Sequence, residues 1–328
     1  MSAPQKILIL RFSSIGDLVL ITPTIRCFSK TFPNAQIHLL CKPQFCHVLA
    51  NNPYINSILP LESNILKQIS YLKSANYDLV LDWQSNLKSR WISLLLNVKT
   101  LRFNKLNFKK WLAVRFKTLE VLPQQHIVDR YFKSLESLGV TYDGSGLDFF
   151  VNENSTVCVE TEFKIQKPFV VIGIGASYFT KRISHTKLFE LINGIKWPVI
   201  LIGGPDDINT MNHFKSHFPK QIFFKSDFTL HQSASVIQQA EWIFTSDTGI
   251  MHIAAAFKKP VISFWGNTIP EFGMAPFEPN PQNIILQVKS LECRPCSKLG
   301  FSACPRKHFN CMNQINLNVL KGLPFTPQ

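Results

Sequence analysis

The chain has 328 residues, of which 45% are hydrophobic and 17% charged, so it is neither disordered nor fibrous and fits two packed domains. No apolar run reaches the roughly 20 residues of a membrane-spanning helix, and residues 1–6 lead directly into a predicted strand without a signal peptide, so we expect a cytoplasmic protein. The formal charge of +14 predicts an anionic partner. Because no nucleic-acid-binding motif accompanies this charge, we expect no nucleic acid and favour an anionic membrane surface or lipid headgroup.

The N-terminal half alternates predicted strands and helices. The apolar run 6–11 is typical of a strand buried on both faces, and Thr22 with Pro23 predicts a helix start that leads toward Thr31. Further strands are expected at 36–41, 55–59 and 78–83, and further helices at 63–75, 86–96 and 126–138. The alternation predicts a doubly wound parallel sheet.

The turn after the first strand, 12–17, lies where open α/β sheets bind their ligands. Its carboxylate, Asp17, can serve as a general base or can simply cap the helix that follows, and the residue alone leaves both interpretations open. The turn lacks the G-x-G-x-x-G pattern, so we do not expect a dinucleotide site there.

The segment 99–117 interleaves seven Lys and Arg residues with aliphatic and aromatic residues. This pattern suits the interface of an anionic membrane, although an ordinary solvated helix with one apolar face on the core is the alternative. The residues predicted to contact acceptor or membrane are Lys105, Lys109, Lys110, Arg115 and Arg130.

The domain boundary is expected near 164–168, where polar sequence gives way to a new apolar run, so the predicted domains are 1–165 and 166–328. The strand at 169–173 leads into a turn that ends at Lys181, which could neutralise a phosphate or could be an ordinary solvated lysine. After a strand at 198–202, Asp206 or Asp207 could accept hydrogen bonds from ribose hydroxyls or could cap the next helix.

The stretch 242–268 predicts a strand, a tight turn, a short helix at 250–257 and another strand. The turn presents backbone N–H groups and a positive helix end, which favours an anion. Asp247 could accept hydrogen bonds from sugar hydroxyls or merely cap the helix, and His252 lies about one turn into that helix. The combination predicts a ligand in which a sugar is joined to phosphate.

Four motifs in order carry a resemblance to a known family: Phe12-Ser-Ser-Ile-Gly-Asp17, Gly175-Ala-Ser-Tyr-Phe-Thr-Lys-Arg182, Gly203-Gly-Pro-Asp-Asp207 and Ser246-Asp-Thr-Gly-Ile-Met-His252. On these motifs the chain resembles the family 9 glycosyltransferases, the lipopolysaccharide heptosyltransferases, over nearly its whole length. Gly266-Asn-Thr268 departs from the family's usual Gly-Pro-Thr. The resemblance implies a GT-B fold, in which two Rossmann-like doubly wound domains face a central cleft.

The resemblance also implies inverting, metal-independent transfer of heptose from ADP-L-glycero-β-D-manno-heptose to a lipopolysaccharide inner-core acceptor, either lipid A-Kdo or heptosyl-Kdo. This acceptor is a phosphorylated glycolipid at the inner membrane, so the enzyme is expected to be peripheral to that membrane. Asp17 matches the family's catalytic base, and Lys181 its lysine that contacts phosphate and sugar. The residues expected to bind the donor are Asp247, Thr248, Gly249, His252, Asp206, Asp207, Ser177 and Arg182.

Alternatives of the same class and of other classes stay open. One is a GT-B transferase that uses another nucleotide sugar, because the donor turn specifies phosphate and hydroxyls better than a base. Another is a catalytically silent glycolipid-binding protein, which the presence of both Asp17 and Lys181 disfavours. A nicotinamide-dependent oxidoreductase is disfavoured because Gly173-x-Gly175 is not followed by glycine at position 178, where Tyr178 stands.

The C-terminal region contains a cysteine cluster with the pattern C-x₂-C-x₇-C-x₆-C, formed by Cys293, Cys296, Cys304 and Cys311, and His308 lies nearby. The first pair has the spacing of a zinc knuckle, so a structural zinc site is one hypothesis and reduced free thiols are the other. No cofactor is expected for catalysis. A last helix at 312–323 is expected to pack against the first domain.

Overall fold

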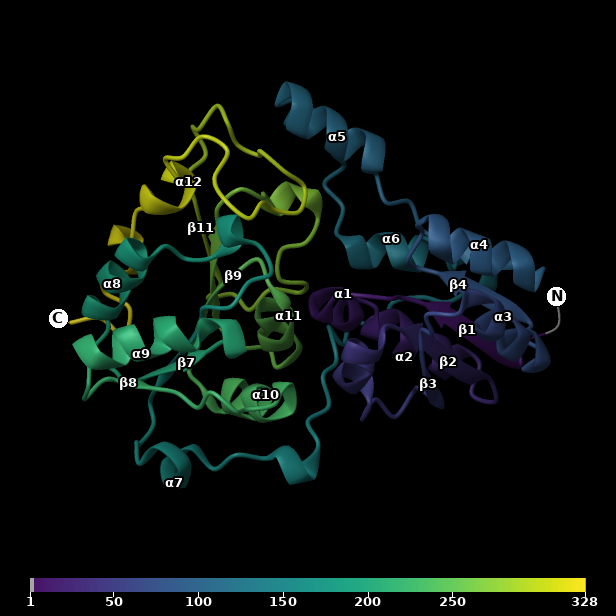
Figure 1. Ribbon diagram of the computed structural model, residues 1–328, viewed down its shortest axis with the longest axis horizontal. Coiled ribbons are helices and arrows are strands. Elements are labelled where there is room, and N and C mark those ends of the chain that lie inside the picture. Colours follow the sequence, from purple (N-terminus) through teal and green to yellow (C-terminus); the bar gives the residue numbers. More distant parts are fainter. Residues whose placement is uncertain (1–2, 328) are drawn as a thin grey trace. The chain divides into compact units, whose positions relative to one another are not determined.

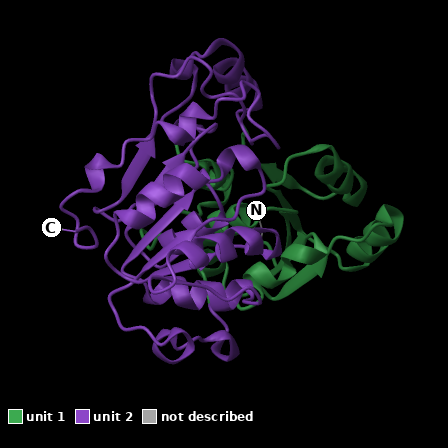
Figure 2. Ribbon diagram, turned by 60° about the vertical axis from the view of Figure 1, so that its left-hand side comes forward, with its two compact units in different colours: residues 1–105, 125–150 green, residues 106–124, 151–328 purple. Residues whose placement is uncertain are grey.

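The computed structural model describes residues 3–327, and its contacts divide the chain into two compact units (Figure 2). Unit 1 is residues 1–105 with 125–150, and unit 2 is residues 106–124 with 151–328. The sequence placed a single boundary near 164–168. The structure instead assigns two further segments, 106–124 and 151–165, to the unit that holds the C-terminal half.

The core of unit 1 is a five-stranded parallel sheet in the order β3-β2-β1-β4-β5. Figure 1 labels the first four of these strands. The central strand, β1, contributes Ile7, Leu8, Ile9 and Leu10, none of which is exposed, as the continuous apolar run predicts. The strands are β1 Lys6–Leu10, β2 Gln36–Cys41, β3 Ser57–Pro60, β4 Leu79–Asp82 and β5 Thr100–Arg102. The order changes direction at β1, as in Rossmann-like sheets.

The α-helices of unit 1 are α1 Ile15–Leu20, α2 Thr22–Thr31, α3 Ile65–Ser74, α4 Leu87–Leu96 and α6 Ile127–Lys133, with 3-10 turns η1 Pro43–Leu49 and η3 Glu136–Leu138. The sequence missed α1, because 12–17 has the composition of a turn. The chain in fact becomes helical at Ile15, one residue after the N-cap Ser14. The helix expected at 126–138 is split into α6 and η3, and Gly139 follows with a φ of 71°, as its expected role after the last turn requires.

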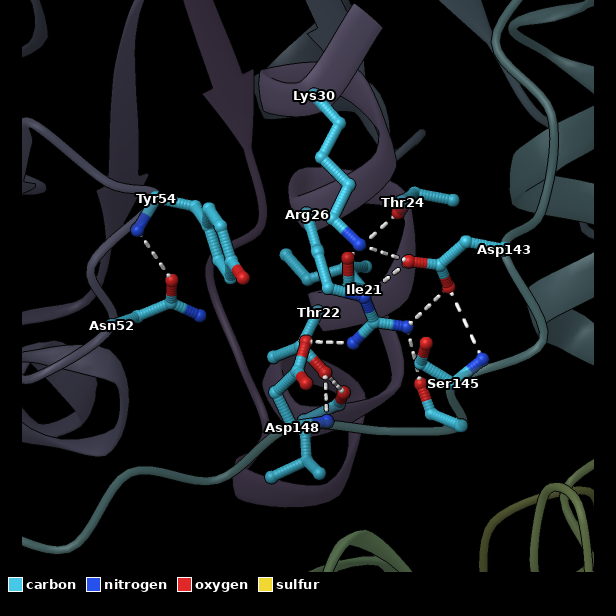
Figure 3. A network of polar contacts seen from close by, with 12 residues as sticks. Ile21, Thr22, Thr24, Arg26, Lys30, Asn52, Tyr54, Asp143, Ser145 and Asp148 are labelled. Atoms are coloured by element: carbon cyan, nitrogen blue, oxygen red, sulfur yellow. Dashed lines mark hydrogen bonds and ion pairs between the residues drawn. The ribbon is translucent and has the colours of Figure 1, made fainter. Parts of the chain in front are cut away.

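A buried arginine joins α2 to the segment that ends unit 1 (Figure 3). Arg26 is 3% exposed, and its guanidinium makes ion pairs with Asp143 and Asp148. The distance from its Nε to the Asp143 carboxylate is 3.0 Å, and Lys30 Nζ lies 2.7 Å from the same carboxylate. The Asp148 backbone N–H donates to Thr22 Oγ1 at 2.9 Å. This network fixes the otherwise irregular 140–150 segment against α2.

The core of unit 2 is a six-stranded parallel sheet in the order β11-β10-β9-β6-β7-β8. Its strands are β6 Val170–Gly173, β7 Val199–Ile202, β8 Ile222–Phe223, β9 Trp242–Ser246, β10 Val261–Trp265 and β11 Ile284–Gln287. Every residue of β6, β7, β9 and β10 is buried, so these strands form the interior of the sheet. Two parallel α/β units of this kind confirm the doubly wound class.

The α-helices of unit 2 are α5 Asn107–Phe116, α7 Val159–Phe163, α8 His185–Asn193, α9 Ile208–His217, α10 Leu230–Gln239, α11 Gly249–Ala256 and α12 Asn310–Asn313. Its 3-10 turns are η2 Leu119–Val121, η4 Glu153–Ser155, η5 Phe179–Lys181, η6 Pro205–Asp207, η7 Pro270–Phe272 and η8 Asn318–Leu320. The helix expected at 312–323 is wrong, since only α12 and η8 form there. Leu320 and Phe325 are instead buried in the unit 2 core.

The assignment of 106–124 to unit 2 has a packing reason. Ala113 on α5 and Leu122 just beyond it form a small buried cluster with Ile269 and Phe272 from the loop after β10. Within residues 3–327 no helix is both long enough and apolar enough to cross a membrane.

Candidate functional site

Two distant motifs meet in unit 2. Lys181 Nζ lies 2.6 Å from Asp247 Oδ2 and donates to the Asp247 backbone carbonyl at 3.1 Å. Thr268 Oγ1 donates to the same Oδ2 at 3.0 Å. These residues follow β6, β9 and β10, which are neighbours in a parallel sheet, so the carboxyl ends of their strands share one edge. We call these three side chains the Lys181 cluster.

The contacts of Asp247 exclude one of its two interpretations. The N-cap position of α11 belongs to Thr248, which makes no side-chain capping bond, so Asp247 is not a helix cap. Its carboxylate is occupied by Lys181 and Thr268, and only 8% of the residue is exposed. The ion pair therefore fixes the ammonium group of Lys181 beside the turn that opens α11. An ammonium has three donors, and two are used here.

The start of α11 is tightly packed. A Cβ at Gly173 would lie 2.9 Å from the side chain of Ile250, so the strand and helix approach each other closely. Thr248 Oγ1 is 3.1 Å from Thr245 Oγ1, which anchors the turn to β9. His252, expected to face the ligand, is only 2% exposed and lies within the packed interior.

Asp207 has a structural role in the same unit. Its carboxylate accepts the Gly204 N–H at 2.9 Å and lies 3.2 Å from Arg182 Nη1. A Cβ at Gly175 would lie 2.7 Å from Asp207 Oδ2, so a larger residue there would displace that carboxylate. Asp207 thus caps the 3-10 turn η6, whereas at the N-cap position of α9 its side chain makes no capping bond, so the expected cap of that helix is not formed. Its ion pair with Arg182 joins two of the sequence motifs. Asp206 is exposed and remains sterically available for a ligand.

The other predicted donor residues differ in accessibility. Arg182 also donates to the Ala176 carbonyl at 3.3 Å, whereas Ser177 lies exposed in the same loop.

Asn267, which stands where the family usually has proline, is 1% exposed. Neither polar atom of its side chain has a hydrogen-bond partner among the described residues.

In unit 1, Asp17 occupies the third position of α1. Its Oδ2 accepts hydrogen bonds from the Ser14 backbone N–H and from Ser14 Oγ, both at 2.9 Å. Arg11 makes an ion pair with the same carboxylate. Asp17 therefore caps the helix, and 21% of its side chain is still exposed and accessible to a substrate.

Arg11 was missed from the sequence because it closes an apolar strand and resembles a strand-end residue. Burial lowers the pKa of its guanidinium, but the Asp17 carboxylate and the Tyr131 phenol outweigh burial and raise that pKa above its ordinary value. Burial in turn raises the pKa of Tyr131 to about 12. Arg11 also donates to the Trp83 carbonyl, which fixes its orientation.

The predicted acceptor and membrane residues fall into three groups. Lys109 and Arg115 are exposed on α5, and Lys105 and Lys110 are half-buried. Lys110 Nζ lies 5.5 Å from the centre of the Phe272 ring. Arg130 is 3% exposed and donates to the Asn104 carbonyl at 3.2 Å, and burial lowers its pKa. A side chain buried in this way does not lie on a membrane-facing surface, so Arg130 is removed from that set.

The cysteine cluster is not arranged as the zinc site that was one of its two interpretations. Cys293 Sγ lies 4.0 Å from His308 Nε2, and burial raises the pKa of the Cys296 thiol above its usual value and that of Cys311 to about 12. Throughout residues 3–327, no group of three or more His, Cys, Asp or Glu side chains is arranged to hold a metal ion. All eight cysteines are free, and the residues present do not fit a bound zinc.

Comparison with solved structures gives the fold. The glycosyltransferase family 9 protein of Veillonella parvula has a TM-score of 0.72 at 18% identity, covering 87% of both chains. The ADP-heptose LPS heptosyltransferase II of E. coli has a TM-score of 0.66 at 19% identity, covering 94% of this chain and 98% of the other. The two parallel α/β units therefore have the GT-B fold.

Comparison of sequences gives the family. Lipopolysaccharide heptosyltransferase 3 of Escherichia coli K12 is 26% identical over 314 residues, with 82% of this chain and 84% of that protein covered. The model of glycosyltransferase family 9 (heptosyltransferase) matches residues 65–301, which is well over half of the chain. The chain therefore belongs to glycosyltransferase family 9, the heptosyltransferase family, and is a glycosyltransferase.

Proposed function

We propose that this enzyme transfers a heptose from ADP-L-glycero-β-D-manno-heptose to a phosphorylated lipopolysaccharide inner-core acceptor. The family membership supports the reaction class, and the name of the E. coli protein of similar fold supports the donor. The observation that carries the proposal is the Lys181 cluster. It fixes the ammonium group of Lys181, ion-paired with Asp247, at the carboxyl edge of the unit 2 sheet, where α/β folds bind nucleotides.

The Lys181 cluster has a chemical role in this proposal. As the bond from the anomeric carbon to the diphosphate breaks, negative charge grows on the leaving oxygen atoms. The Lys181 ammonium and the backbone N–H groups of Thr248 and Gly249 stabilise that charge, and they are already oriented before the reaction begins. Asp247 and Thr268 hold the ammonium in place, so little reorganisation is required.

Asp17 is proposed as the base that accepts the proton from the attacking acceptor hydroxyl. Its hydrogen bonds to Ser14 fix the carboxylate, and the buried Arg11 provides a counter-charge. The capping role and the catalytic role are compatible, because a carboxylate has about four acceptor positions.

The acceptor is proposed to be reached at an anionic membrane surface. α5 exposes Phe108, Trp111 and Phe116, with exposed fractions of 70%, 52% and 60%, beside the cations Lys109 and Arg115. Aromatic and basic side chains together favour the headgroup region of an anionic bilayer. Neutralising Lys109 and Arg115 is expected to weaken vesicle binding, and unchanged binding would remove α5 from the proposal.

A screen of the donor tests the proposal. We expect ADP-heptose and ADP to raise the melting temperature more than UDP- or GDP-sugars do. Asp17→Asn should retain ADP affinity within about threefold but lose about 10² to 10⁴ in transfer rate. Lys181→Ala should lose about 10² to 10³, whereas the exposed Lys220→Ala should behave as wild type. A larger shift with UDP- or GDP-sugars would favour a transferase for another donor.

A further inference from the structure

Helix α4 in unit 1 presents apolar side chains to solvent. Leu87, Trp91 and Leu94 have exposed fractions of 79%, 61% and 72%. Their spacing of i, i+4 and i+7 places them in one stripe along the helix. The opposite side buries Ser89 and Ser93, which are 0% and 3% exposed. An ordinary surface helix has the reverse arrangement.

The polar groups on the buried side of α4 are nevertheless hydrogen-bonded. Ser93 Oγ donates to the Ser89 carbonyl at 2.9 Å, and Ser89 Oγ accepts the Asn86 N–H at 2.9 Å. Ile92 and Leu96 complete the contact with the unit 1 core, where α4 packs beside α3 and β4 (Figure 1). The fold therefore does not depend on the outward side chains of Leu87, Trp91 and Leu94. Exposing their apolar surface to water is unfavourable by about 25 cal/mol per Å².

The surroundings of the stripe are strongly cationic. Residues 83–105, the part of this segment that belongs to unit 1, contain five Lys and Arg and no Asp or Glu. Lys88 and Arg90 are exposed on α4 itself, on either flank of the stripe. Where α4 ends, a groove of about 790 Å³ runs between the helix and β5. Its cationic lining residues are Arg90, Lys99 and Arg102, of which Arg102 is ion-paired with Asp82.

We infer that the outer face of α4, with its groove, docks onto the surface of an anionic phospholipid bilayer. Trp91 and the two leucines enter the headgroup region, while a lipid phosphate occupies the cationic groove. Charge complementarity favours a bilayer over a second copy of this chain. A two-fold contact would place this basic patch against itself on two chains that each carry +14. The inference extends the proposed function, since it gives unit 1 its own membrane contact in addition to α5.

The test is co-sedimentation of the full-length chain with vesicles of phosphatidylcholine, alone or mixed with phosphatidylglycerol. Wild type should bind only the mixed vesicles, and more weakly at high salt. Lys88→Gln with Arg90→Gln should weaken binding about thirtyfold, since each cation at the surface contributes about 1 kcal/mol. The triple variant Leu87→Ser, Trp91→Ser and Leu94→Ser should bind weakly even at low salt. Lys220→Gln and Val319→Ser, both changes at exposed positions in unit 2, serve as matched controls.

Two outcomes would overturn the inference. One is vesicle binding by the α4 variants that equals wild type, with their fold verified by circular dichroism. The other is a lipid-free dimer of wild type that the α4 variants lose, because the stripe would then be an interface between copies.

The proposed function is tested separately, by transfer to a water-soluble acceptor that lacks its lipid. The α4 variants should retain this activity. If neither the wild-type enzyme nor any variant transfers heptose, the donor proposal is wrong, and the vesicle-binding result is unaffected.

Discussion

At the scale of single residues, the main finding is that Lys181, Asp247 and Thr268 act as one group. The sequence suggested separate ligand contacts for the lysine and the aspartate, which stand 66 residues apart. Thr268 and Arg11 were not predicted as polar partners, because spacing along a chain does not show which strand ends share an edge. The strand order supplies that information.

The energetic coupling between Lys181 and Asp247 can be measured. Asp247→Asn removes the counter-charge of a largely buried ammonium, so we expect the free energy of unfolding to fall by about 1–3 kcal/mol. Lys181→Met should have a similar cost. The double variant should cost clearly less than the sum, because neither partner is then left alone. Denaturant titration gives the values, and strictly additive costs would show that the contact contributes nothing.

At the scale of elements, the interior strands were predicted well because buried parallel strands are continuous apolar runs, whereas the edge strands β5, β8 and β11 were not predicted. The helices were predicted less accurately. α1 was taken for a turn, and the expected last helix at 312–323 is broken into α12 and η8. The Arg26 network could not be predicted from the sequence, because it joins α2 to carboxylates more than 110 residues away.

This network predicts a response to acid. The Arg26 guanidinium holds the pKa of Asp143 far below its ordinary value, despite partial burial, and Lys30 contributes in the same direction. A carboxyl whose pKa is lower in the folded state stabilises the fold above its unfolded pKa of about 4, and this contribution is lost as the pH falls through the folded pKa.

Asp143→Asn should therefore lower the free energy of unfolding at neutral pH and should flatten its decline below about pH 4. Urea titration across this range tests the prediction. Asp227→Asn, a change at an exposed position in unit 2, is the control and should keep the wild-type profile. An unchanged profile for Asp143→Asn would show that the network does not govern acid stability.

At the scale of the whole molecule, four short motifs were sufficient to predict the GT-B class, because together they resemble those of the family 9 glycosyltransferases, and the solved structures confirm the fold. The assignment of residues to the two units could not be predicted in the same way. Residues 106–124 belong to unit 2 through contacts of Ala113 and Leu122 with residues after β10, which no local pattern indicates. The outward apolar stripe of α4 was also hidden, because the spacing of its leucines is equally that of a core-facing helix.

The central claim is that this glycosyltransferase moves one heptose from ADP-heptose to an inner-core glycolipid. Its most direct measurement is mass spectrometry of an inner-core acceptor after incubation with ADP-L-glycero-β-D-manno-heptose and the purified enzyme. The account predicts a mass gain of one heptose with release of an equal amount of ADP, and almost no product with Asp17→Asn or Lys181→Ala. An unmodified acceptor with wild-type enzyme, or as much product from either variant as from wild type, would contradict it.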